Sequence, residues 1–488
     1  MRFNKFKIII SLLLIIVVYQ QIWRSIGRDT YIDNISKFIP ISVKISIQET
    51  FFKNKMQNIE IEKLKKENEK LNEILIQNDR DKLALKFKLR EPIRINHTED
   101  KKFKIFNENF SIKKFETPYN TPKHYGKGTA YLAIGKKNIY IVGAGGLISY
   151  IEKDEFLSEE SYPKKINPIN TNLKQIITDD KFYSQSTYGI KGALTFKNQI
   201  FISYTKEVKK DCYNTSLLVA DLNTYFLNFK DFFAEKACVE IDNDYGEFTA
   251  HQSGGKILAY DINHLLLSVG EYRYRDHAQD KSNYFGKIIK INLNTKKYEI
   301  LSMGHRNVHG MYYDKDAAKI FSVEHGPDGG CEININELSS PNIKNFGWPI
   351  SSYGDHYAGK REDEGENIRI KYEKAPFYKS HEKYGFLEPA FYFLPSLGPS
   401  SVSKVPNTYF DKRKANKNRD YIIVGTLGWK KREGEKSIHF FKFENNKLVE
   451  KDFFELQDRV RDIIYDHELD VFYLWTETTA SISVLKKI

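Results

Sequence analysis

The sequence is poor in cysteine, in proline and in long apolar runs. It has 3 Cys and 14 Pro among 488 residues, so at most one intrachain disulfide can form and one thiol is left over. Hydrophobic residues make up 41% of the chain and charged residues 29%. These proportions are close to globular averages and exclude both wholesale disorder and a polytopic membrane protein. Most of the chain should therefore fold in water.

The sequence also lacks any block of Lys and Arg interleaved with aromatic residues. The 76 Lys and Arg against 64 Asp and Glu give a net charge of +12, which is only mildly basic. Without a concentrated basic groove we expect no nucleic-acid partner. Aromatic residues, in contrast, are plentiful, with 31 Tyr and 33 Phe. Together with the β-branched residues they favour β-sheet.

One apolar run stands at the N-terminus, from Ile8 to Tyr19, and only Ser11 interrupts it. Its length fits the core of a signal peptide, about 7 to 15 residues, whereas a full transmembrane helix takes about 20. The basic residues before the run favour a cytoplasmic N-terminus. The small-x-small triplet at 25–27 follows bulky residues and makes a poor cleavage site. We therefore expect residues 1–27 to be an uncleaved signal anchor in the inner membrane with the rest of the chain in the periplasm, and cleavage is the alternative.

Residues 28–102 are expected to form a helical stalk. Between Gln57 and Asn78 the spacing of one set of residues alternates between three and four, as in a coiled-coil seam, with Asn68 at an a position that would favour a parallel homodimer. The seam consists of Gln57, Ile61, Leu64, Asn68, Leu71, Leu75 and Asn78. We expect a possible coiled coil over 54–80, and a single solvated helix is the alternative.

Residues 103–488 contain short β-rich runs in place of long amphipathic helices. Each of six runs follows a polar turn and a weaker strand, and they lie at 138–142, 199–203, 264–268, 319–323, 421–424 and 471–474. Dividing the 386 residues by six gives about 64 residues per unit, and repeated four-stranded units of that size are typical of a β-propeller. We therefore expect an all-β, six-bladed β-propeller, and a pair of β-sandwiches is the alternative.

Cys212 and Cys238 flank one candidate pair of strands. A disulfide between them would tie that loop and would suit an exported domain. Two free buried thiols are the alternative, because geometry cannot be read from the sequence. Cys331 would be left unpaired.

Two polar and glycine-rich stretches indicate a functional site. In 304–310, Arg306 and Asn307 offer a guanidinium fork and an amide, which suit a ligand that carries carboxylates or a quinone. In 324–330, glycine and proline can point backbone carbonyls inward, and carbonyl with carboxylate oxygens suits Ca²⁺. A glycine-rich loop without a ligand is the alternative.

His251, Arg459 and Arg461 are further candidates. An unperturbed imidazole accepts a proton at neutral pH, so His251 at the entrance to a strand is a candidate general base; a purely structural histidine is the alternative. Arg459 and Arg461 are two residues apart and share one face of a strand, so both can point into one cavity. An outer face paired with Asp458 and Asp462 is the alternative.

From about residue 120 to the C-terminus the sequence resembles the glucose/sorbosone dehydrogenase family, the soluble-type aldose sugar dehydrogenases that use pyrroloquinoline quinone (PQQ). The resemblance rests on ordered motifs: HQSGG at His251, GHRN at Gly304, EHGP with CEIN from Glu324, NFGWP at Asn345, PSLGPSS at Pro395 and DRVRDII at Asp458. It implies a six-bladed propeller that uses PQQ and Ca²⁺ to oxidise an aldose sugar at C1, with hydride passing to the quinone and then electrons to a further acceptor.

The resemblance also implies a role for each candidate residue. His251 would take the proton of the sugar C1 hydroxyl. Arg306 and Asn307 would contact the quinone oxygens, and Arg459 and Arg461 would bind the carboxylates of PQQ.

Gly326 and Pro327 would lend backbone carbonyls to the Ca²⁺ that polarises the cofactor.

Three positions depart from the family pattern. Leu394 stands where an aromatic residue stacks on the cofactor, Gly428 stands where a cofactor-binding Lys is expected, and Glu271 replaces an Asp after the HQSGG strand. These departures leave one alternative open, a non-catalytic propeller that binds a glycan or a protein partner.

Overall fold

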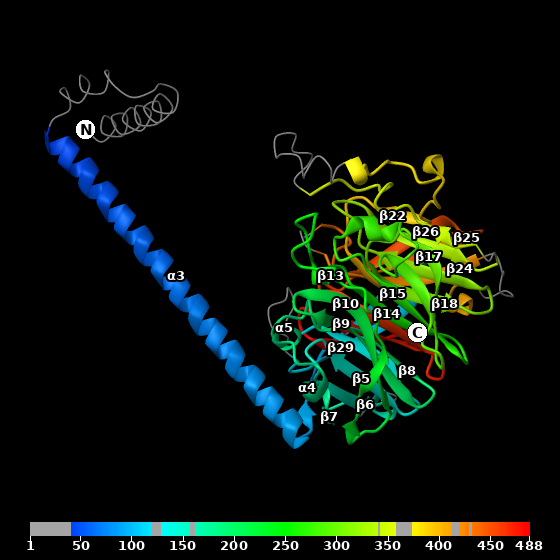
Figure 1. The fold of residues 1–488 in the computed structure, drawn as a ribbon. Helices are drawn as coiled ribbons and strands as arrows, with labels where there is room; N and C mark the ends of the chain where they lie inside the picture. The colour runs from blue at the N-terminus through cyan, green and yellow to red at the C-terminus, as the bar shows by residue number, and fades with distance from the viewer. Residues whose placement is uncertain are drawn as a thin grey trace. The chain divides into compact units, whose positions relative to one another are not determined.

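The structure is a computed structural model that describes residues 41–119, 128–156, 162–339, 342–357, 373–411, 419–428 and 432–488 (Figure 1). The chain divides into two units, one through Asn78 and one from Asp79 onward. Helix α3 (Ile41–Leu89) provides all described residues of the first unit and the start of the second. The predicted anchor, residues 1–27, lies outside the described residues. Within those residues, no helix combines the length and the apolar character that crossing a bilayer requires.

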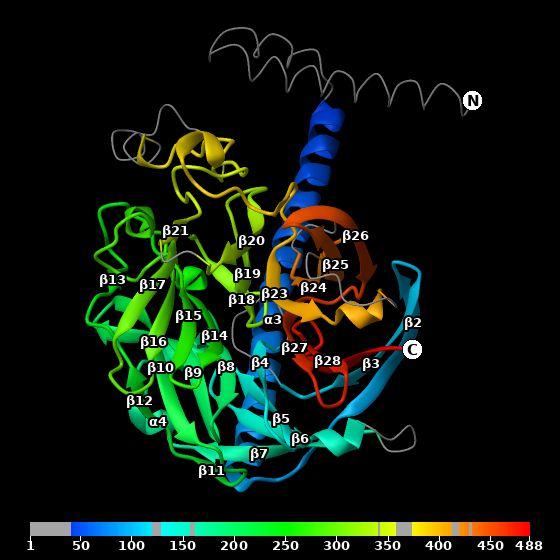
Figure 2. The same cartoon turned by 90° about the vertical axis from the view of Figure 1, so that its right-hand side faces the viewer.

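The second unit contains a ring of six sheets whose strands are mainly antiparallel. The inner strand of each sheet contacts the inner strand of the next sheet, and the sixth contacts the first, so the ring closes. Figure 2 shows these strands gathered around the middle of the ring. They are β4 (Ala130–Ile134), β8 (Ile190–Phe196), β14 (Gly254–Asp261), β18 (Val308–Asp314), β23 (Pro399–Val405) and β27 (Val460–Asp466). The predicted all-β, six-bladed β-propeller is confirmed.

Each sheet continues outward from its inner strand. The first sheet adds β5 (Asn138–Gly143), β6 (Ile148–Glu152), β7 (Lys165–Thr171), β1 (Ile93–Arg94) and β11 (Phe226–Leu227). The second adds β9 (Gln199–Lys209), β10 (Cys212–Asp221), β12 (Lys230–Phe233) and β13 (Val239–Glu240). The third adds β15 (His264–Val269), β16 (Lys287–Asn292), β17 (Tyr298–Met303) and β21 (Lys344–Asn345).

The last three sheets are built in the same way. The fourth adds β19 (Lys319–Glu324), β20 (Cys331–Glu337) and β22 (Phe391–Phe393). The fifth adds β24 (Arg419–Thr426), β25 (Ser437–Glu444) and β26 (Lys447–Glu455). The sixth adds β28 (Val471–Thr476), β29 (Ser481–Lys487), β3 (Glu108–Glu116) and β2 (Asn96–Ile105). Short helices in the connections are α4 (Leu173–Ile176), α5 (Asp180–Ser184), η1 (Lys153–Phe156), η2 (Ala250–Gln252), η3 (Arg275–Ala278), η4 (Glu382–Tyr384) and η5 (Asn407–Tyr409).

The six β-rich runs of the sequence are the second strands of the six sheets. β28 is buried along its whole length, and β5 and β15 are buried at every residue but the first. These strands are covered on both faces because neighbouring sheets pack against each other in the ring, and continuous apolar runs suit such strands.

The sixth sheet contains strands from both ends of the propeller. Strand β3 pairs antiparallel with β29, and β2 pairs with β3 at the outer edge. The predicted boundary between residues 102 and 103 therefore falls inside β2, and β1 and β2 already belong to propeller sheets. The sequence hid β2 because this edge strand is mostly exposed and rich in charged residues, which is how proteins protect the edges of sheets.

The C-terminal end of α3 belongs to the core of the second unit. Leu83 and Phe87 are buried in a cluster with Phe115, Tyr119 and Trp475. The ring of Tyr119 packs edge-on against Phe87 and Trp475, with centroid distances of 5.8 Å and 5.6 Å. The last turns of the helix therefore pack where the sixth and first sheets meet.

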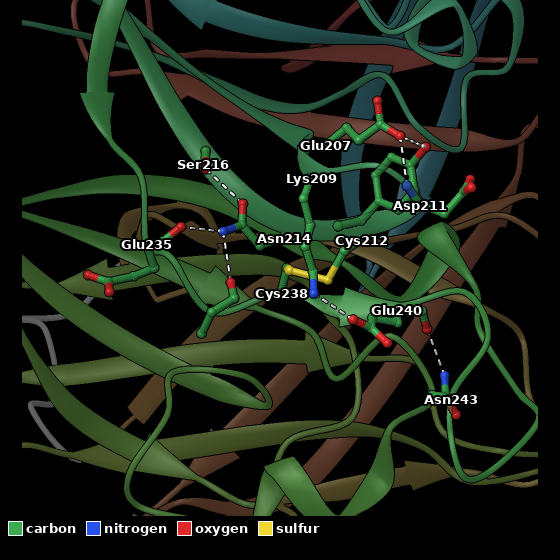
Figure 3. Close-up of a disulfide and its surroundings, with 12 residues drawn as sticks. Glu207, Lys209, Asp211, Cys212, Asn214, Ser216, Glu235, Cys238, Glu240 and Asn243 are labelled. Atoms are coloured by element: carbon green, nitrogen blue, oxygen red, sulfur yellow. Dashed lines mark hydrogen bonds and ion pairs between the residues drawn. A yellow bond between two sulfur atoms is a disulfide. The ribbon is translucent and has the colours of Figure 1, made fainter.

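A disulfide joins Cys212 to Cys238 with a Cα–Cα distance of 5.5 Å (Figure 3), which is one of the two alternatives that the sequence left open. Next to it, the Asn214 side-chain amide donates hydrogen bonds of 2.8 Å and 2.9 Å to the carbonyls of Glu235 and Ala237. These contacts hold the segment between β12 and β13 against the start of β10. Within the described residues, Cys331 is the free cysteine, and it is buried.

Candidate functional site

A cavity of about 520 Å³ lies at the centre of the ring. Each of the six inner strands contributes lining residues at or near its start. The cavity contains all seven residues singled out from the sequence: His251, Arg306, Asn307, Gly326, Pro327, Arg459 and Arg461. The structure thus brings together candidates that come from separate blades. Their individual roles remain predictions.

His251 lies on the short helix η2 before β14. The Thr249 hydroxyl caps this helix by accepting a hydrogen bond of 3.4 Å from the His251 backbone N–H. The His251 side chain is exposed and lines the cavity. Asn307 fixes the same turn from the neighbouring blade, because its Nδ2 donates to the His251 carbonyl at 3.0 Å and its Oδ1 accepts from the Gly254 N–H at 3.1 Å.

The remaining hydrogen of the Asn307 amide faces His309, whose Nε2 lies 2.9 Å from Asn307 Nδ2. Both hydrogens of this amide are therefore engaged within the protein. In this arrangement Asn307 positions the predicted base and has no further donor for a quinone oxygen.

Arg306 connects the start of β18 to the loop that follows β19. Its Nη1 donates hydrogen bonds of 2.9 Å to the carbonyls of both His325 and Gly326. Its guanidinium carbon lies 5.3 Å from the centroid of the Trp348 ring, within the range of a cation–π contact. Arg306 is thus held in place with its charge at the cavity.

The predicted calcium ligands do not fit a Ca²⁺ ion. Ca²⁺ takes about six to eight oxygen ligands, and the sequence nominated only the carbonyls of Gly326 and Pro327. The Gly326 carbonyl accepts from the Arg306 guanidinium, whose charge would repel a cation, and the Pro327 carbonyl accepts from the Gly330 N–H at 3.1 Å. In the described part of the chain, no cluster of three or more His, Cys, Asp or Glu residues is suited to hold a metal ion.

Arg459 and Arg461 share one buried carboxylate. Glu477 Oε2 lies 3.1 Å from Arg459 Nε, and Glu477 Oε1 lies 2.5 Å from Arg461 Nε. Arg459 Nη1 also donates to the carbonyls of Leu427 and Gly428, at 3.2 Å and 2.6 Å. Glu477 thus holds both guanidinium groups at the cavity.

The alternative, an outer face on which these arginines pair with Asp458 and Asp462, is not observed among the ion pairs of the described residues. Asp458 instead forms an ion pair of 2.8 Å with Lys114 of β3, and Asp462 one of 2.7 Å with Lys256 of β14. Both carboxylates are buried and link β27 to other strands. They stabilise the ring and leave the arginine side chains to the cavity.

Two buried groups of the cavity are absent from the sequence analysis. Burial lowers the pKa of Lys191 to about 7, with a further contribution from Arg461, and the Lys191 Nζ donates to the carbonyls of Ser186 and Thr187. Burial, Arg461 and Arg306 lower the pKa of His325 to about 3. Burial and the neighbouring arginines thus both disfavour further protonation in the cavity, and a bound anion would offset these effects. No local sequence pattern marks Lys191, because the sequence shows neither its burial nor its closeness to Arg461.

The three departures from the family pattern have different structural outcomes. Leu394 is 66% exposed, and Gly428 lines the cavity and places its carbonyl on Arg459. Glu271 is fully buried, which raises the pKa of its carboxyl to about 7 although Arg306 and Arg275 act to lower it.

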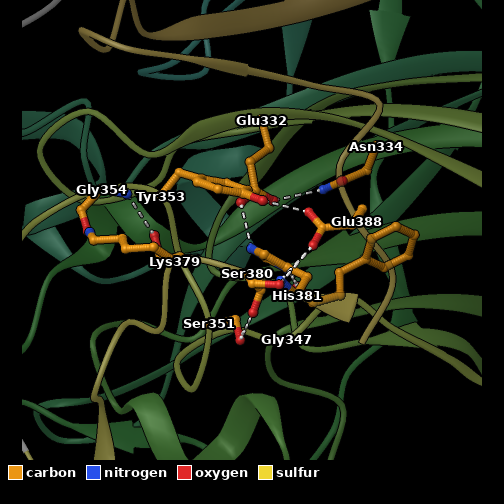
Figure 4. Close-up of polar contacts among 12 residues, drawn as sticks. Glu332, Asn334, Gly347, Ser351, Tyr353, Gly354, Lys379, Ser380, His381 and Glu388 are labelled. Atoms are coloured by element: carbon orange, nitrogen blue, oxygen red, sulfur yellow. Dashed lines mark hydrogen bonds and ion pairs between the residues drawn. The ribbon is translucent and has the colours of Figure 1, made fainter. Parts of the chain in front are cut away.

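A network of buried polar side chains supports the loop that carries Gly326 and Pro327. Glu324 accepts from the Arg306 N–H at 2.8 Å and from Asn334 Nδ2 at 2.8 Å. Figure 4 shows the continuation of this network, in which His381 lies between Glu332 and Glu388. Burial and the neighbouring Glu324 raise the pKa of Glu332 well above its usual value. Through Glu324, this network holds the start of the loop that carries Gly326 and Pro327.

Comparisons with known proteins agree with this fold. The aldose sugar dehydrogenase YliI of Escherichia coli is 28% identical over 199 residues, which cover 37% of this chain and 49% of that protein. The matched segments span less than half the length of the curated relatives.

Two solved structures show the same fold at low sequence identity. The apo-form of the soluble aldose sugar dehydrogenase of E. coli has a TM-score of 0.57 and 18% identity, covering 78% of this chain and 100% of that one. The holo form of the PQQ domain of pyranose dehydrogenase from Coprinopsis cinerea has a TM-score of 0.50 and 12% identity, covering 81% and 97%. The Glucose / Sorbosone dehydrogenase family matches residues 188–484, more than half of the chain. The protein therefore belongs to the glucose/sorbosone dehydrogenase family.

Proposed function

We propose that this protein is a PQQ-dependent dehydrogenase that oxidises aldose sugars at C1. The observation that carries the proposal is the convergence of His251, Arg306, Arg459 and Arg461, from three blades, on one cavity of about 520 Å³. Membership of the glucose/sorbosone dehydrogenase family supports it, as does the PQQ domain of the pyranose dehydrogenase with a similar fold.

The chemistry of the cavity fits PQQ, an anionic quinone that carries carboxylates. Arg459 and Arg461 would hold its carboxylates, because both line the cavity and Glu477 fixes both side chains there. Burial lowers the pKa of Lys191 to about 7. A bound anion nearby would raise this pKa again, so that Lys191 would carry a positive charge beside PQQ. When bound, PQQ would supply the hydride acceptor that the side chains themselves cannot provide.

The protein side of the reaction requires a base and a stabilised charge. His251 is exposed to the cavity and held through its backbone by Thr249 and Asn307, so its imidazole can accept the proton of a sugar hydroxyl. The Arg306 guanidinium would stabilise negative charge that develops nearby. We derive no step through Ca²⁺, because the two nominated carbonyls do not form a suitable ligand set.

The decisive experiment compares wild type with His251→Ala. The purified protein is reconstituted with PQQ and assayed for dye reduction with a panel of aldoses, while PQQ binding is measured separately by fluorescence. We expect His251→Ala to reduce turnover by about 10²- to 10⁴-fold with unchanged PQQ binding. His264→Ala, at an outer histidine that pairs with Asp261, is the control and should keep full activity.

Two results would contradict the proposal. Failure to bind PQQ at micromolar concentration would favour the non-catalytic propeller that binds a glycan or a protein partner. Full activity of His251→Ala would remove that residue from the role of base.

We also propose that residues 1–27 anchor the protein in the inner membrane with the propeller in the periplasm. The apolar run behind basic residues supports the anchor, and the bond between Cys212 and Cys238 suits an oxidising compartment.

The proposed homodimer would form through the stalk. Four apolar seam residues are about half exposed or more along α3: Ile61, Leu64, Leu71 and Leu75. A second copy of the helix would cover these side chains.

A further inference from the structure

A second cavity, of about 110 Å³, adjoins the main one and is called the annex below. The two cavities share the lining residues Gln252, Arg273, Arg306, Pro327 and Tyr357. Gln252 follows the predicted base directly in the chain, so a ligand that reaches His251 can extend into the annex. The remaining annex residues are Glu247, Arg275, Trp348, His356 and Phe377.

The annex carries more positive than negative charge. Arg273, Arg275 and Arg306 line it, and the acidic residue among the lining, Glu247, forms an ion pair of 3.2 Å with Arg275 Nη2. No carboxylate of the described ranges lies within ion-pair distance of Arg273 or Arg306. Glu271 is buried nearby, but burial raises its pKa to about 7, so this carboxyl is partly protonated at neutral pH. Two guanidinium groups therefore lack a full counter-charge.

Two buried donors of the annex lack acceptors among the described residues. Trp348 is 5% exposed, and its indole Nε1–H has no hydrogen-bond partner. The Nη1 group of Arg275 is likewise buried without a partner. Native proteins rarely leave buried donors unpaired. An ionised carboxylate presents acceptor oxygens only, so it matches this set of donors.

The walls of the annex are aromatic. The guanidinium carbon of Arg275 lies 5.8 Å from the Phe377 ring, and the ring of His356 stacks on Phe377 at 3.8 Å. Tyr357, which is 56% exposed, stands where the two cavities join. Flat aromatic faces with a few polar groups suit the apolar face of a sugar ring.

The backbone that carries Arg273 is held in an unusual conformation. Tyr272 and Arg273 have φ angles of 55° and 71°, in the left-handed region that residues with a side chain seldom adopt. Tyr272 is fully buried, and its hydroxyl lies 2.8 Å from Thr215 Oγ1, so the surrounding structure imposes this turn. Such strain is concentrated at ligand sites, and here it places Arg273 in the lining of both cavities.

We propose that the annex binds the carboxylate of an anionic aldose, so that the substrate class is uronic acids in preference to neutral sugars. This inference rests on the proposed function, since it assumes that the sugar ring lies in the main cavity beside His251. Arg273 is then a specificity-determining residue that contacts the carboxylate.

The test measures kcat/KM of the full chain, reconstituted with PQQ, for D-glucuronate and D-galacturonate against D-glucose and D-galactose. We expect the uronates to be preferred, and Arg273→Gln to lower kcat/KM for uronates by about tenfold or more, the effect of one charge-assisted hydrogen bond. Neutral sugars should change little, and Arg273→Lys should restore part of the uronate activity. Lys209→Gln, which removes an exposed cation paired with Glu240, is the matched control.

Isothermal titration of D-glucuronate into the same proteins without PQQ gives a readout that needs no turnover. Binding to wild type that Arg273→Gln weakens would support the annex even if no sugar is oxidised, in which case only the proposed function fails. Oxidation of neutral sugars at equal or greater kcat/KM would overturn the inference and leave the proposed function intact. An equal effect of Arg273→Gln on both sugar classes would overturn it too.

Discussion

At the scale of single residues, Glu477 is the carboxylate that two arginines of the cavity share. Glu477 is fully buried and contacts both Arg459 and Arg461, and it also accepts a hydrogen bond of 2.9 Å from the Thr129 hydroxyl. Glu477 thus links the turn after β28 to the starts of β4 and β27. Its removal would take away the carboxylate that both buried guanidinium groups share.

We expect Glu477→Gln to lower the free energy of unfolding by about 3 to 5 kcal/mol, because breaking a buried ion pair from one side leaves an unpaired charge. Urea denaturation followed by tryptophan fluorescence measures the loss. Glu299→Gln is the control, since this 69% exposed partner of Lys290 should change the value by about 0.5 kcal/mol or less. Equal losses in both variants would contradict the importance of burial.

Lys191 makes the stability of the empty propeller depend on pH. Its folded pKa of about 7 lies below the ordinary value of 10.5, so between these values the unfolded chain holds a proton that the folded chain lacks. The free energy of unfolding therefore rises with pH through this window, and the burial penalty is fully present below it. We expect Lys191→Met to be more stable than wild type at pH 7, with a gap that shrinks toward pH 10.

Urea denaturation of both proteins without PQQ, at several pH values, checks this expectation. Lys290→Met serves as the control, because this lysine lies on β16 and pairs with Glu299 outside the cavity. A gap between wild type and Lys191→Met that is independent of pH would show that Lys191 is not buried as described.

Sequence reasoning found the site residues that stand in short polar motifs and missed those defined only by the fold. Arg306 and His251 stand out because Gly, His and Asn cluster around them. Glu477 lies in the turn after β28 and Lys191 lies in β8, and neither stands in a polar, glycine-rich motif that marks it in the sequence. The calcium site stays a prediction, and the sequence could not show that the Gly326 carbonyl, one of its two nominated ligands, accepts from the Arg306 guanidinium.

At the scale of elements, the sequence predicts strands well where both faces are buried. The second strand of every blade was found because it is a continuous apolar run, whereas β2 was hidden by its charges. The same physical logic applies in reverse to α3, where the apolar side chains of Ile61, Leu64, Leu71 and Leu75 are about half exposed or more. These exposed residues are what the proposed coiled coil must cover.

We expect the double substitution Leu64→Asp and Leu71→Asp to convert a dimer into a monomer, because it places two charges in the seam of each helix. Light scattering after size-exclusion chromatography of the full chain in detergent measures the mass. Lys63→Asp and Lys70→Asp, which have the same spacing but lie outside the seam, are the matched control. A wild-type monomer, or loss of the dimer in both double variants, would contradict the seam.

At the scale of the whole molecule, the proposed anchor determines where the propeller works. We expect the full chain to remain in the membrane fraction after washing at alkaline pH, because an inserted apolar helix resists extraction. A chain that lacks residues 1–27 should appear in the soluble fraction with the same propeller fold by circular dichroism. Extraction of the full chain by the wash would contradict anchoring.

The pairing of β3 with β29 has a consequence for the order of folding. Because β29 follows all other described strands in the chain and pairs with β3, the sixth blade cannot be completed until β29 has been synthesised. Until then, the edge of β3 that pairs with β29 is unpaired in the hairpin of β2 and β3. The charges of Lys113 and Lys114 on β3 disfavour pairing of this edge with other strands. Closure of the ring is therefore the last step in folding of the propeller. A chain without β29 would lose the strand that joins β3 to β28, and with it the sixth blade.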